Sequence, residues 1–527
     1  MTIASAQVAA VISNSESLNC GNWKVINAKL PIGSAVLGAK KMGSSSTAAS
    51  PGASGAGKGR STRNALIAVI VVIVIVVAGA AAYFLTRPSG NSQQYITVGT
   101  LYASSGSFAL SSGYQLAGLK LWINQTNAQG GLMVSSLGKK LPLKLIALDD
   151  QSSTTTATTL YTNLITQDHV DILVADFGST LTAPAVAIAQ EHHVLLFDPT
   201  ASTPGFFTAT NPYIVDLSIL VSSEWPLVLA HYLISQKSNI SRVAILYLNQ
   251  AFTTAQAQTL DSTLVSAGIS PVYYQSTSAS SAAEYSTLLQ SINATHPQAV
   301  LNFGYDTNDI AFYSALSANS MHFNFTFTIY SGLEFSLLHA QTPSGSLNYT
   351  YTYASPPDVQ YANVNLGPTT AAFVSNWTSS YGSSPNFNNI AGFNAGLLIG
   401  KTIETAGSLN QTALRQAVNK LSGNITTLEG PFVINTSTGA QLGMPMDLLQ
   451  YQPSSGGLKP VVIYPTAVAT GTAIYPAPAV VVSSTPLNSP AVASAESYYS
   501  ISSSALPASA LCLRNDDGIA VSGVNRN

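Results

Sequence analysis

Residues 171–204, "DILVADFGSTLTAPAVAIAQEHHVLLFDPTASTP", contain a strand, a helix and a second strand in close succession. The runs "DILVAD" and "VLLFD" are short and apolar, as in strands that are buried on both faces. The intervening "LTAPAVAIAQEH" has the length of a helix. Because two strands joined by a helix run parallel, the segment predicts a mainly parallel sheet with helices on its faces.

The same alternation continues on both sides of this segment. Strands are expected before it at 95–102 and 141–148, with helices at 113–128 and 154–168. After Pro212 the pattern restarts, with strands at 242–248, 270–275, 298–305 and 325–332 and helices at 254–268, 282–293 and 308–319. A late helix at 389–407 and a hairpin arm at 431–440 follow. Two consecutive α/β sheets of similar size predict two Rossmann-like lobes joined by a hinge.

An uncharged stretch, Ala65–Leu85, precedes both lobes. Its 21 residues are enough to cross a hydrocarbon core of about 30 Å as a helix. Seven Lys and Arg residues come before it, against Glu16 alone, which places the low-complexity region 1–64 in the cytoplasm. We therefore expect a single-pass protein of the cell membrane whose remaining residues are extracellular. Cys20 and Cys512 then lie on opposite sides of the membrane and do not pair.

Composition agrees with an extracellular location. Only 8% of the residues are charged, against roughly 25% in typical globular proteins, so hydroxyl and amide side chains supply the surface polarity. Nine Asn-x-Ser/Thr sequons follow the uncharged stretch and predict a glycoprotein: Asn124, Asn239, Asn293, Asn324, Asn348, Asn376, Asn410, Asn424 and Asn435. Residues 466–527 are rich in Ala, Pro and Ser and predict an extended or disordered tail, with a small partner-binding segment as the alternative.

Catalytic motifs are scarce in this sequence. Asp149–Asp150 is the one paired carboxylate in the folded pattern and could act as an acid–base pair, although the hydroxyls that follow favour a capping role. His192–His193 have no further ligands at metal-binding spacing. Gly-x-Ser-x-Gly, Walker and Gly-x-Gly-x-x-Gly motifs are absent. The sequence predicts neither an enzyme nor a cofactor or metal site, and a net charge of −2 does not indicate a nucleic-acid partner.

Binding residues are expected at the carboxyl ends of the strands, where open α/β sheets hold their ligands. In the first half these are Phe108, Ser179, Thr180, Thr200, Ala201 and Ser202. Hydroxyls and free backbone N–H groups at a helix start suit a carboxylate. In the second half the candidates are Phe252, Tyr305, Asp306 and Glu334. There an acid could pair with an ammonium group, and aromatic rings could surround an apolar side chain.

Two long segments carry a family resemblance. Residues 98–132, "VGTLYASSGSFALSSGYQLAGLKLWINQTNAQGGL", and 141–204, which end in "DFGSTLTAPAVAIAQEHHVLLFDPTASTP", resemble type I periplasmic-binding proteins. Within that family they are most similar to the leucine/isoleucine/valine-binding proteins of ABC importers. The resemblance extends over 95–465. It implies a first lobe of about 95–216 and 350–425, and a second of about 217–349 and 426–465.

The resemblance also implies roles for the candidate residues. Ser179, Thr200, Ala201 and Ser202 would hold the ligand's α-carboxylate and help with its ammonium group. Glu334, Tyr305 and Phe252 would form the opposite wall, and Phe108 would line the side-chain pocket. The sequence departs from the family at "LNQAFTTA" and, by about one residue, in the register of Glu334. These departures concern the identity of the ligand more than its class.

The N-terminal region carries a second resemblance. "GKGRSTRNALIAVIVVIVIVV" is similar to the pilin-like signal sequences of archaeal surface solute-binding proteins, in which a peptidase cuts after a Lys-Gly pair, here Lys58–Gly59. A plain uncleaved anchor is the alternative. In both cases the hydrophobic helix stays on the protein.

The leading hypothesis is a membrane-anchored, extracellular solute-binding protein that delivers an amino acid of the branched-chain type, or a similar small amphiphile, to an ABC permease. A ligand-sensing receptor ectodomain of the same fold is the second hypothesis. A structural cell-surface glycoprotein and an extracellular hydrolase follow.

Overall fold

The computed structural model describes residues 93–444 and 446–479. The predicted cytoplasmic region 1–64, the predicted membrane helix 65–85 and the tail beyond residue 479 lie outside these residues. Among the helices of the described ranges, none is both long enough and apolar enough to span a membrane.

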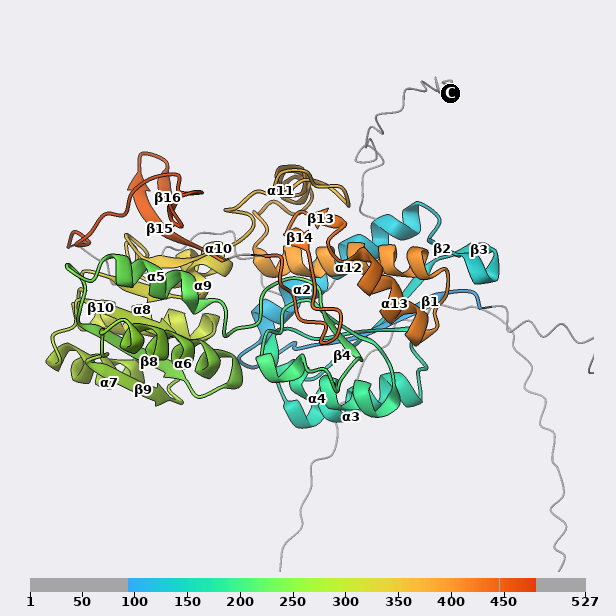
Figure 1. Cartoon of the computed structure of the whole chain (residues 1–527), viewed down its shortest axis with the longest axis horizontal. Coiled ribbons are helices and arrows are strands. Elements are labelled where there is room, and N and C mark those ends of the chain that lie inside the picture. The colour runs from blue at the N-terminus through green and yellow to red at the C-terminus, as the bar shows by residue number, and fades with distance from the viewer. Residues whose placement is uncertain (1–92, 445, 480–527) are drawn as a thin grey trace, which may run out of the picture. The chain divides into compact units, whose positions relative to one another are not determined.

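The first lobe is built on a five-stranded parallel sheet with the strand order β4-β1-β5-β6-β7. Its strands are β1 (Ile96–Tyr102), β4 (Leu143–Asp149), β5 (Ile172–Val174), β6 (Leu196–Asp198) and β7 (Ile214–Asp216). Helices α3 (Thr154–Thr166) and α4 (Gly178–His192) cover one face, while α2 (Ala109–Ala128), α12 (Phe387–Ala406) and α13 (Gln411–Leu421) cover the other (Figure 1). This arrangement confirms the parallel α/β sheet predicted from 171–204.

The second lobe contains a seven-stranded sheet with the order β16-β15-β12-β11-β10-β8-β9. Its five parallel strands are β8 (Val243–Leu248), β9 (Tyr273–Thr277), β10 (Ala299–Phe303), β11 (Thr326–Thr328) and β12 (Tyr351–Ala354). The antiparallel strands β15 (Asp447–Ser454) and β16 (Gly457–Tyr464) extend it at one edge (Figure 1). The helices of this lobe are α5 (Pro226–Ser235), α6 (Ala251–Ser266), α7 (Ala282–Ala294), α8 (Asp306–Ala318), α9 (Tyr330–Leu333) and α10 (Phe335–Gln341).

Smaller elements complete the described chain. A hairpin of β2 (Leu132–Val134) and β3 (Lys139–Leu141) encloses the 3-10 turn η1 (Ser135–Leu137), and a second turn, η2, spans Pro204–Phe206. Helix α11 (Thr370–Tyr381) and the hairpin of β13 (Ile425–Thr427) and β14 (Gly430–Phe432) pack on the first lobe, because Phe373, Trp377, Ile425 and Phe432 belong to its core.

Helices α2 and α12 pack with their backbones in contact. This packing makes α12 part of the first lobe, although it follows the parallel strands of the second lobe in the chain. A Cβ added at Gly392 would stand 2.0 Å from the carbonyl oxygen of Gln115, and one at Gly118 would stand 2.0 Å from that of Asn389. A Cβ at Gly396 would stand 2.2 Å from the Trp122 ring. Asn389 Nδ2 donates to the Tyr114 carbonyl oxygen, and the pairs 389–114, 392–115 and 396–122 advance in the same direction along both helices, so the helices run parallel and both begin at the same end.

The crossings between the lobes differ in position from those implied by the sequence. Strand β12 pairs with β11 and β15, so residues 351–354 belong to the second sheet rather than to the first lobe. Residues 425–434 pack in the first-lobe core, so the return to the second lobe comes later than residue 426. Neither the short strand β12 nor the β13–β14 hairpin has a sequence pattern that indicates which lobe it joins.

The structure also differs from two further predictions, the strand over 325–332 and the extended tail that begins at residue 466. The strand expected over 325–332 is confined to Thr326–Thr328, and the chain then turns into α9, which leads directly to Glu334. Residues 466–479 contain neither helix nor strand, but they are bonded to the second lobe: Ala477 N donates to Asn324 O (2.9 Å) and Ile474 N to Gln450 Oε1 (2.8 Å).

Candidate ligand-binding cleft

A pocket lies where the carboxyl ends of strands from both lobes meet. Residues of both lobes line it: Phe177, Gly178, Ser179, Thr200, Ile219, Trp225, Phe252, Tyr305, Tyr330, Leu333, Phe387 and Asn388. Half of these side chains are aromatic. They leave a cavity of about 10 Å³, which is about the least space that holds one water molecule. The side chains of the two lobes therefore fill most of the space between the strand ends.

The first-lobe wall consists of two loops that bond to each other. Ser179 Oγ accepts hydrogen bonds from the backbone N–H groups of Ser202 (3.1 Å) and Thr203 (3.2 Å). Thr200 Oγ1 accepts from Gly178 N (3.1 Å) and donates to Gln115 Oε1 (2.6 Å). Because Ser179 acts as an acceptor in both of its contacts, its own proton remains to be donated.

Unsatisfied hydroxyls add to this wall. Ser202 Oγ and Thr203 Oγ1 are buried and have no hydrogen-bond partner among the described residues. Such hydroxyls are costly to bury unless a partner arrives. Ala201 contributes differently: its backbone N–H donates to Asp198 Oδ1 (2.8 Å), and it does not line the pocket. Its predicted contact with a ligand stays a prediction.

Tyr305 lies at the centre of an aromatic cluster that closes the cleft. Its ring centroid lies 5.0 Å from that of Phe108 in an edge-on arrangement, 5.5 Å from that of Phe252 and 5.8 Å from that of Tyr330. Its hydroxyl lies 3.5 Å from Thr180 Oγ1, which joins the two lobes. Of these predicted residues, Phe252 and Tyr305 line the pocket, whereas Phe108 and Thr180 contact Tyr305 without lining it.

Glu334 is buried and bonded to the other lobe. Its Oε1 accepts from Ser111 Oγ in α2 and from Asn388 Nδ2 in α12, and Ser111 Oγ also lies 3.2 Å from Asp306 Oδ2. Burial, together with the charges of neighbouring acids, raises the pKa of Glu334 well above its usual value, and burial also raises the pKa of Asp306. The two acids predicted from the sequence therefore lie side by side, near the start of two first-lobe helices.

Several cleft residues were missed in the sequence: Ser111, Phe177, Trp225, Tyr330 and Asn388. Phe177 and Tyr330 lie within a few residues of Ser179 and Glu334, so a wider window around those positions would have included them. Trp225 packs edge-on against Phe252 at 5.3 Å. Ser111 and Trp225 come after the ends of β1 and β7 but beyond the loop residues next to those ends, and Asn388 follows no strand end.

Further buried acids lie at the strand ends of the first sheet. Asp150, Asp176, Asp198 and Asp216 are almost completely buried, and each has one oxygen without a hydrogen-bond partner among the described residues. Burial is the main cause of their raised pKa values, and it raises the pKa of Asp198 to about 7. Asp149 instead accepts from Ser104 Oγ (2.6 Å). These contacts favour the structural interpretation of Asp149–Asp150.

The two histidines lie at the end of α4, His192 in its last turn and His193 directly after it. His193 ends α4 in a left-handed conformation, with φ of 57°, and its ring centroid lies 5.1 Å from that of Tyr213. Within the described ranges, no group of three or more His, Cys, Asp or Glu side chains is placed to hold a metal ion.

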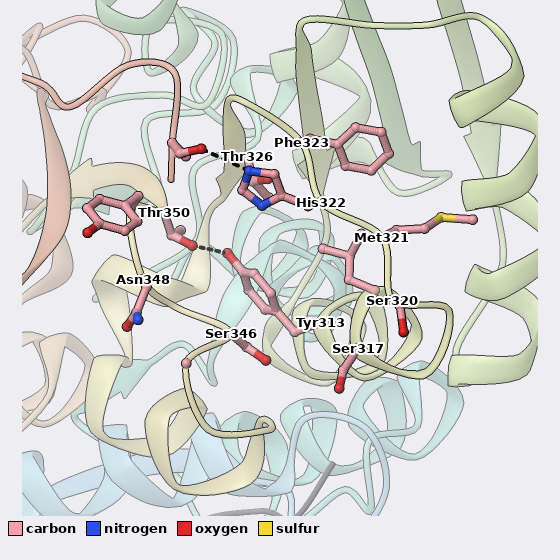
Figure 2. Close-up of a pocket in the computed structure, with 14 residues that line it drawn as sticks. Tyr313, Ser317, Ser320, Met321, His322, Phe323, Thr326, Ser346, Asn348 and Thr350 are labelled. Atoms are coloured by element: carbon pink, nitrogen blue, oxygen red, sulfur yellow. Dashed lines mark hydrogen bonds between the residues drawn. The ribbon is translucent and has the colours of Figure 1, made fainter. Parts of the chain in front are cut away.

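A larger pocket, of about 280 Å³, lies in the second lobe (Figure 2). The Tyr313 hydroxyl lies 2.9 Å from Thr350 Oγ1, and His322 Nε2 lies 2.9 Å from the carbonyl oxygen of Ala477 (Figure 2). Because Thr326 begins β11 and Thr350 precedes β12, this pocket lies at the amino ends of the strands. It is formed by one lobe and is remote from the strand ends at which the two lobes meet.

Two α/β lobes that meet over a pocket at their strand ends define a class of proteins that bind solutes by opening and closing. Solved structures agree with this architecture. The branched-chain amino acid transporter substrate-binding protein LivJ of Streptococcus pneumoniae, in complex with isoleucine, is 18% identical; the match covers 70% of this chain and 100% of that chain with a TM-score of 0.58. A solute-binding protein of R. palustris, in complex with benzoate, is 18% identical, with coverages of 75% and 100% and a TM-score of 0.58.

A leucine-binding protein, LivK, of Thermotoga maritima is 15% identical, with coverages of 71% and 100% and a TM-score of 0.57. At these identities the structures establish the fold. Residues 95–457 match the family described as periplasmic binding protein, and the chain belongs to that family. The resemblance to periplasmic-binding proteins is thereby confirmed over residues 95–457, and a family of binding proteins agrees with the expectation of a binder rather than an enzyme.

Proposed function

We propose that this protein is the solute-binding component of an ABC importer and that it binds an amino acid of the branched-chain type, or a similar small amphiphile, between its lobes. The observation that carries this proposal is that the two walls of the cleft offer different groups, hydroxyls on the first lobe and an acid on the second. Ser179 lines one side of an aromatic pocket and is bonded to the loop that carries the Ser202 hydroxyl, while the acid Glu334 is bonded to Asn388, which lines the same pocket. Complexes of related structures with isoleucine and with benzoate support a small amphiphilic ligand.

Each part of such a ligand has a chemical counterpart in the cleft. The α-carboxylate would accept from Ser179 at the start of α4, where the helix end favours negative charge, and from Ser202 in the loop after β6. The ammonium group would approach Glu334. The apolar side chain would pack among Phe108, Phe252 and Tyr305. Since these groups come from both lobes, the ligand would favour the closed arrangement over the open one.

The location of the protein is a further part of the proposal. A membrane helix at Ala65–Leu85 would hold the binding domain at the outer surface of the cell, next to an ABC permease, in an organism that we expect to be archaeal. The charge asymmetry around this segment supports that orientation. Alkaline extraction of membranes tests the anchor: the full-length protein should stay in the pellet, and a variant that lacks 65–85 should not. Recovery of both in the supernatant would contradict it.

Exposure of the sequons supports an extracellular glycoprotein. Eight of the nine sequon asparagines are exposed in the structure, and Asn348 is half-buried. Glycans would help to solubilise a surface with few charges. Mass spectrometry of the protein isolated from its own membrane should find glycans among the eight exposed positions, and unmodified asparagine at all of them would contradict the proposal.

Ligand binding is tested with the full-length protein in detergent. A thermal-shift panel of L-leucine, L-isoleucine and benzoate should raise the melting temperature in the presence of at least one member, because a ligand that binds the native state stabilises it. An unchanged melting temperature with every member, at millimolar concentrations, would overturn the proposed ligand class.

A further inference from the structure

Ser111 lies between two acidic side chains of the other lobe. Its hydroxyl bonds to Glu334 Oε1 and lies 3.2 Å from Asp306 Oδ2. A serine hydroxyl has one proton, so it can donate to only one of these two oxygens. If both acids were ionised, the other contact would join two acceptors. One proton carried by the acid pair resolves this conflict.

The surroundings indicate which acid carries that proton. Glu334 Oε1 accepts from Asn388 as well as from Ser111, and both donors belong to the first turns of α2 and α12. The positive ends of two helices therefore stabilise a negative charge on Glu334, against one such end at Asp306, which is the first residue of α8. A proton on Asp306 can be donated to Ser111, and Ser111 can then donate to Glu334.

Each of the two acids, Asp306 and Glu334, also has a second carboxyl oxygen that does not contact Ser111. Asp306 Oδ1 and Glu334 Oε2 are buried, and the described residues offer them no hydrogen-bond partner. Buried acceptors without donors are unfavourable. An ammonium group brings three N–H donors and a positive charge, which matches what these two oxygens lack.

We propose that Asp306 is a second acidic specificity residue, and that the Asp306–Glu334 pair takes up the ammonium group of the ligand in exchange for its shared proton. The N–H donors of the ligand then replace the O–H donor of Asp306, and one proton leaves to the solvent for each ligand bound. This inference rests on the proposed function, because it concerns the amine end of the same ligand. It favours amine-bearing solutes over simple carboxylates, since a carboxylate near the pair would add another negative charge.

The other titratable groups near the pair do not provide this proton. Burial raises the pKa of Asp309 well above its usual value, but both of its carboxyl oxygens accept hydrogen bonds within its own lobe, from Asn302 Nδ2 and from the backbone N–H of Tyr330, so neither is left for a ligand. Burial raises the pKa of Tyr305 to about 12 and raises that of Tyr330 further from its usual value, so both stay neutral in the physiological range. From the first lobe, α2 and α12 contribute the neutral side chains of Ser111 and Asn388.

Titration calorimetry with the full-length protein counts the exchanged protons. L-Leucine and L-isoleucine are each titrated at pH 5.5 in two buffers that differ in ionisation enthalpy. The wild type is expected to release about one proton per ligand bound. When the titrations are repeated at higher pH, the Kd should fall about tenfold for each unit by which the pH rises, as long as the acid pair still holds its proton before the ligand binds. The slope of this pH profile is a readout that a purely structural role of Asp306 would not produce.

Variants identify the source of the proton. In Asp306→Asn the release should fall to near zero and the affinity at pH 7 should fall about tenfold. Asp447→Asn is the matched control, because burial raises the pKa of Asp447 to about 6 but this residue begins β15 and does not share the Ser111 contact that joins Asp306 to Glu334; proton release should be unchanged. Melting temperatures verify that both variants fold.

The outcomes separate this inference from the proposed function. Binding of leucine or isoleucine without proton release, or release that persists in Asp306→Asn, would overturn the role of the acid pair and leave the amino-acid site in place. Binding of benzoate alone would also overturn it. If leucine, isoleucine and benzoate all fail to bind, both the proposed function and this inference are wrong.

Discussion

Ser179 Oγ accepts the backbone N–H of Ser202 at 3.1 Å, and this bond joins the start of α4 to the loop after β6. Two segments that are separate in the sequence are thereby held as one wall of the cleft. The hydroxyl of Ser179 supports the wall as an acceptor and can face a ligand as a donor. Its two roles can be separated by measuring binding and stability on the same variants.

Removal of either hydroxyl should weaken ligand binding. Ser179→Ala and Ser202→Ala are each expected to cost about 1–3 kcal/mol of binding free energy, because a hydrogen bond to a charged carboxylate is lost. Calorimetry with whichever ligand raises the melting temperature measures the change. Ser262→Ala, at an exposed position of α6, serves as the control and should bind normally. Unchanged affinity in both cleft variants would contradict the assignment of this wall.

Tyr305 should matter through its ring rather than its hydroxyl. The ring contacts Phe108, Phe252 and Tyr330, whereas the hydroxyl reaches Thr180 at a long 3.5 Å. Tyr305→Ala is therefore expected to lower affinity by about 3 kcal/mol, the scale of a large apolar truncation. Tyr305→Phe should stay within about 1 kcal/mol, the net value of a typical hydrogen bond. A larger loss in the Phe variant than in the Ala variant would show that the hydroxyl dominates.

Much of the fold could be predicted from the sequence because its signals are local. Short apolar runs such as 172–175 and 195–197 indicate strands, which the structure contains as β5 and β6, and the small polar residues after them mark the strand ends. This reasoning located Ser179, Ser202, Tyr305 and Glu334, which the structure brings to one cleft. It did not locate Ser111 and Asn388, because these residues reach Glu334 through the packing of α2 on α12, a contact between segments far apart in the chain.

The positions at which the chain crosses between the lobes could not be predicted from the sequence for a similar reason. Tyr351–Ala354 is a strand by composition, but its membership of the second sheet follows from its pairing with β11 and β15. Likewise, Phe432 and Ile434 join the first-lobe core through tertiary packing. Partner choice between two similar sheets depends on contacts that no local pattern encodes.

Close packing of α2 and α12 predicts a sensitive position at Gly392. A Cβ there would stand 2.0 Å from the carbonyl oxygen of Gln115, so the helices must separate. Gly392→Ala is expected to lower the free energy of unfolding by about 1–3 kcal/mol or more, as overpacked cores do. Urea unfolding measures this change. Gly456→Ala, where an added Cβ meets no atom of the described structure within 4 Å, is the control and should unfold like the wild type. Equal stability of the two variants would contradict the backbone contact.

Buried carboxyl groups predict that the domain is more stable in mild acid than at pH 8. Burial raises the pKa of Glu429 to about 8 and that of Asp198 to about 7. Their unfolded pKa values are about 4. Between these limits the folded state binds more protons than the unfolded state, so the free energy of unfolding falls as pH rises from about 4 to about 8. Melting temperatures measured across this range test the direction.

A variant shows whether these groups cause the pH dependence. Glu429→Gln removes one titrating carboxyl while it keeps an oxygen for Asn394, the donor to Glu429 Oε2. The decline in melting temperature between pH 5 and pH 8 should therefore be smaller than in the wild type. A melting temperature that rises with pH in the wild type would contradict the account of the buried acids.

The central claim is that the cleft between the lobes binds the amine end of a small solute at Glu334. Titration calorimetry of L-leucine and L-isoleucine against wild-type and Glu334→Gln full-length protein at pH 7 tests it most directly. We predict that the wild type binds at least one of the two and that the variant binds it about tenfold to a hundredfold more weakly, because a charged hydrogen bond is lost. Equal affinity of the two proteins, or no binding by the wild type, would contradict the claim.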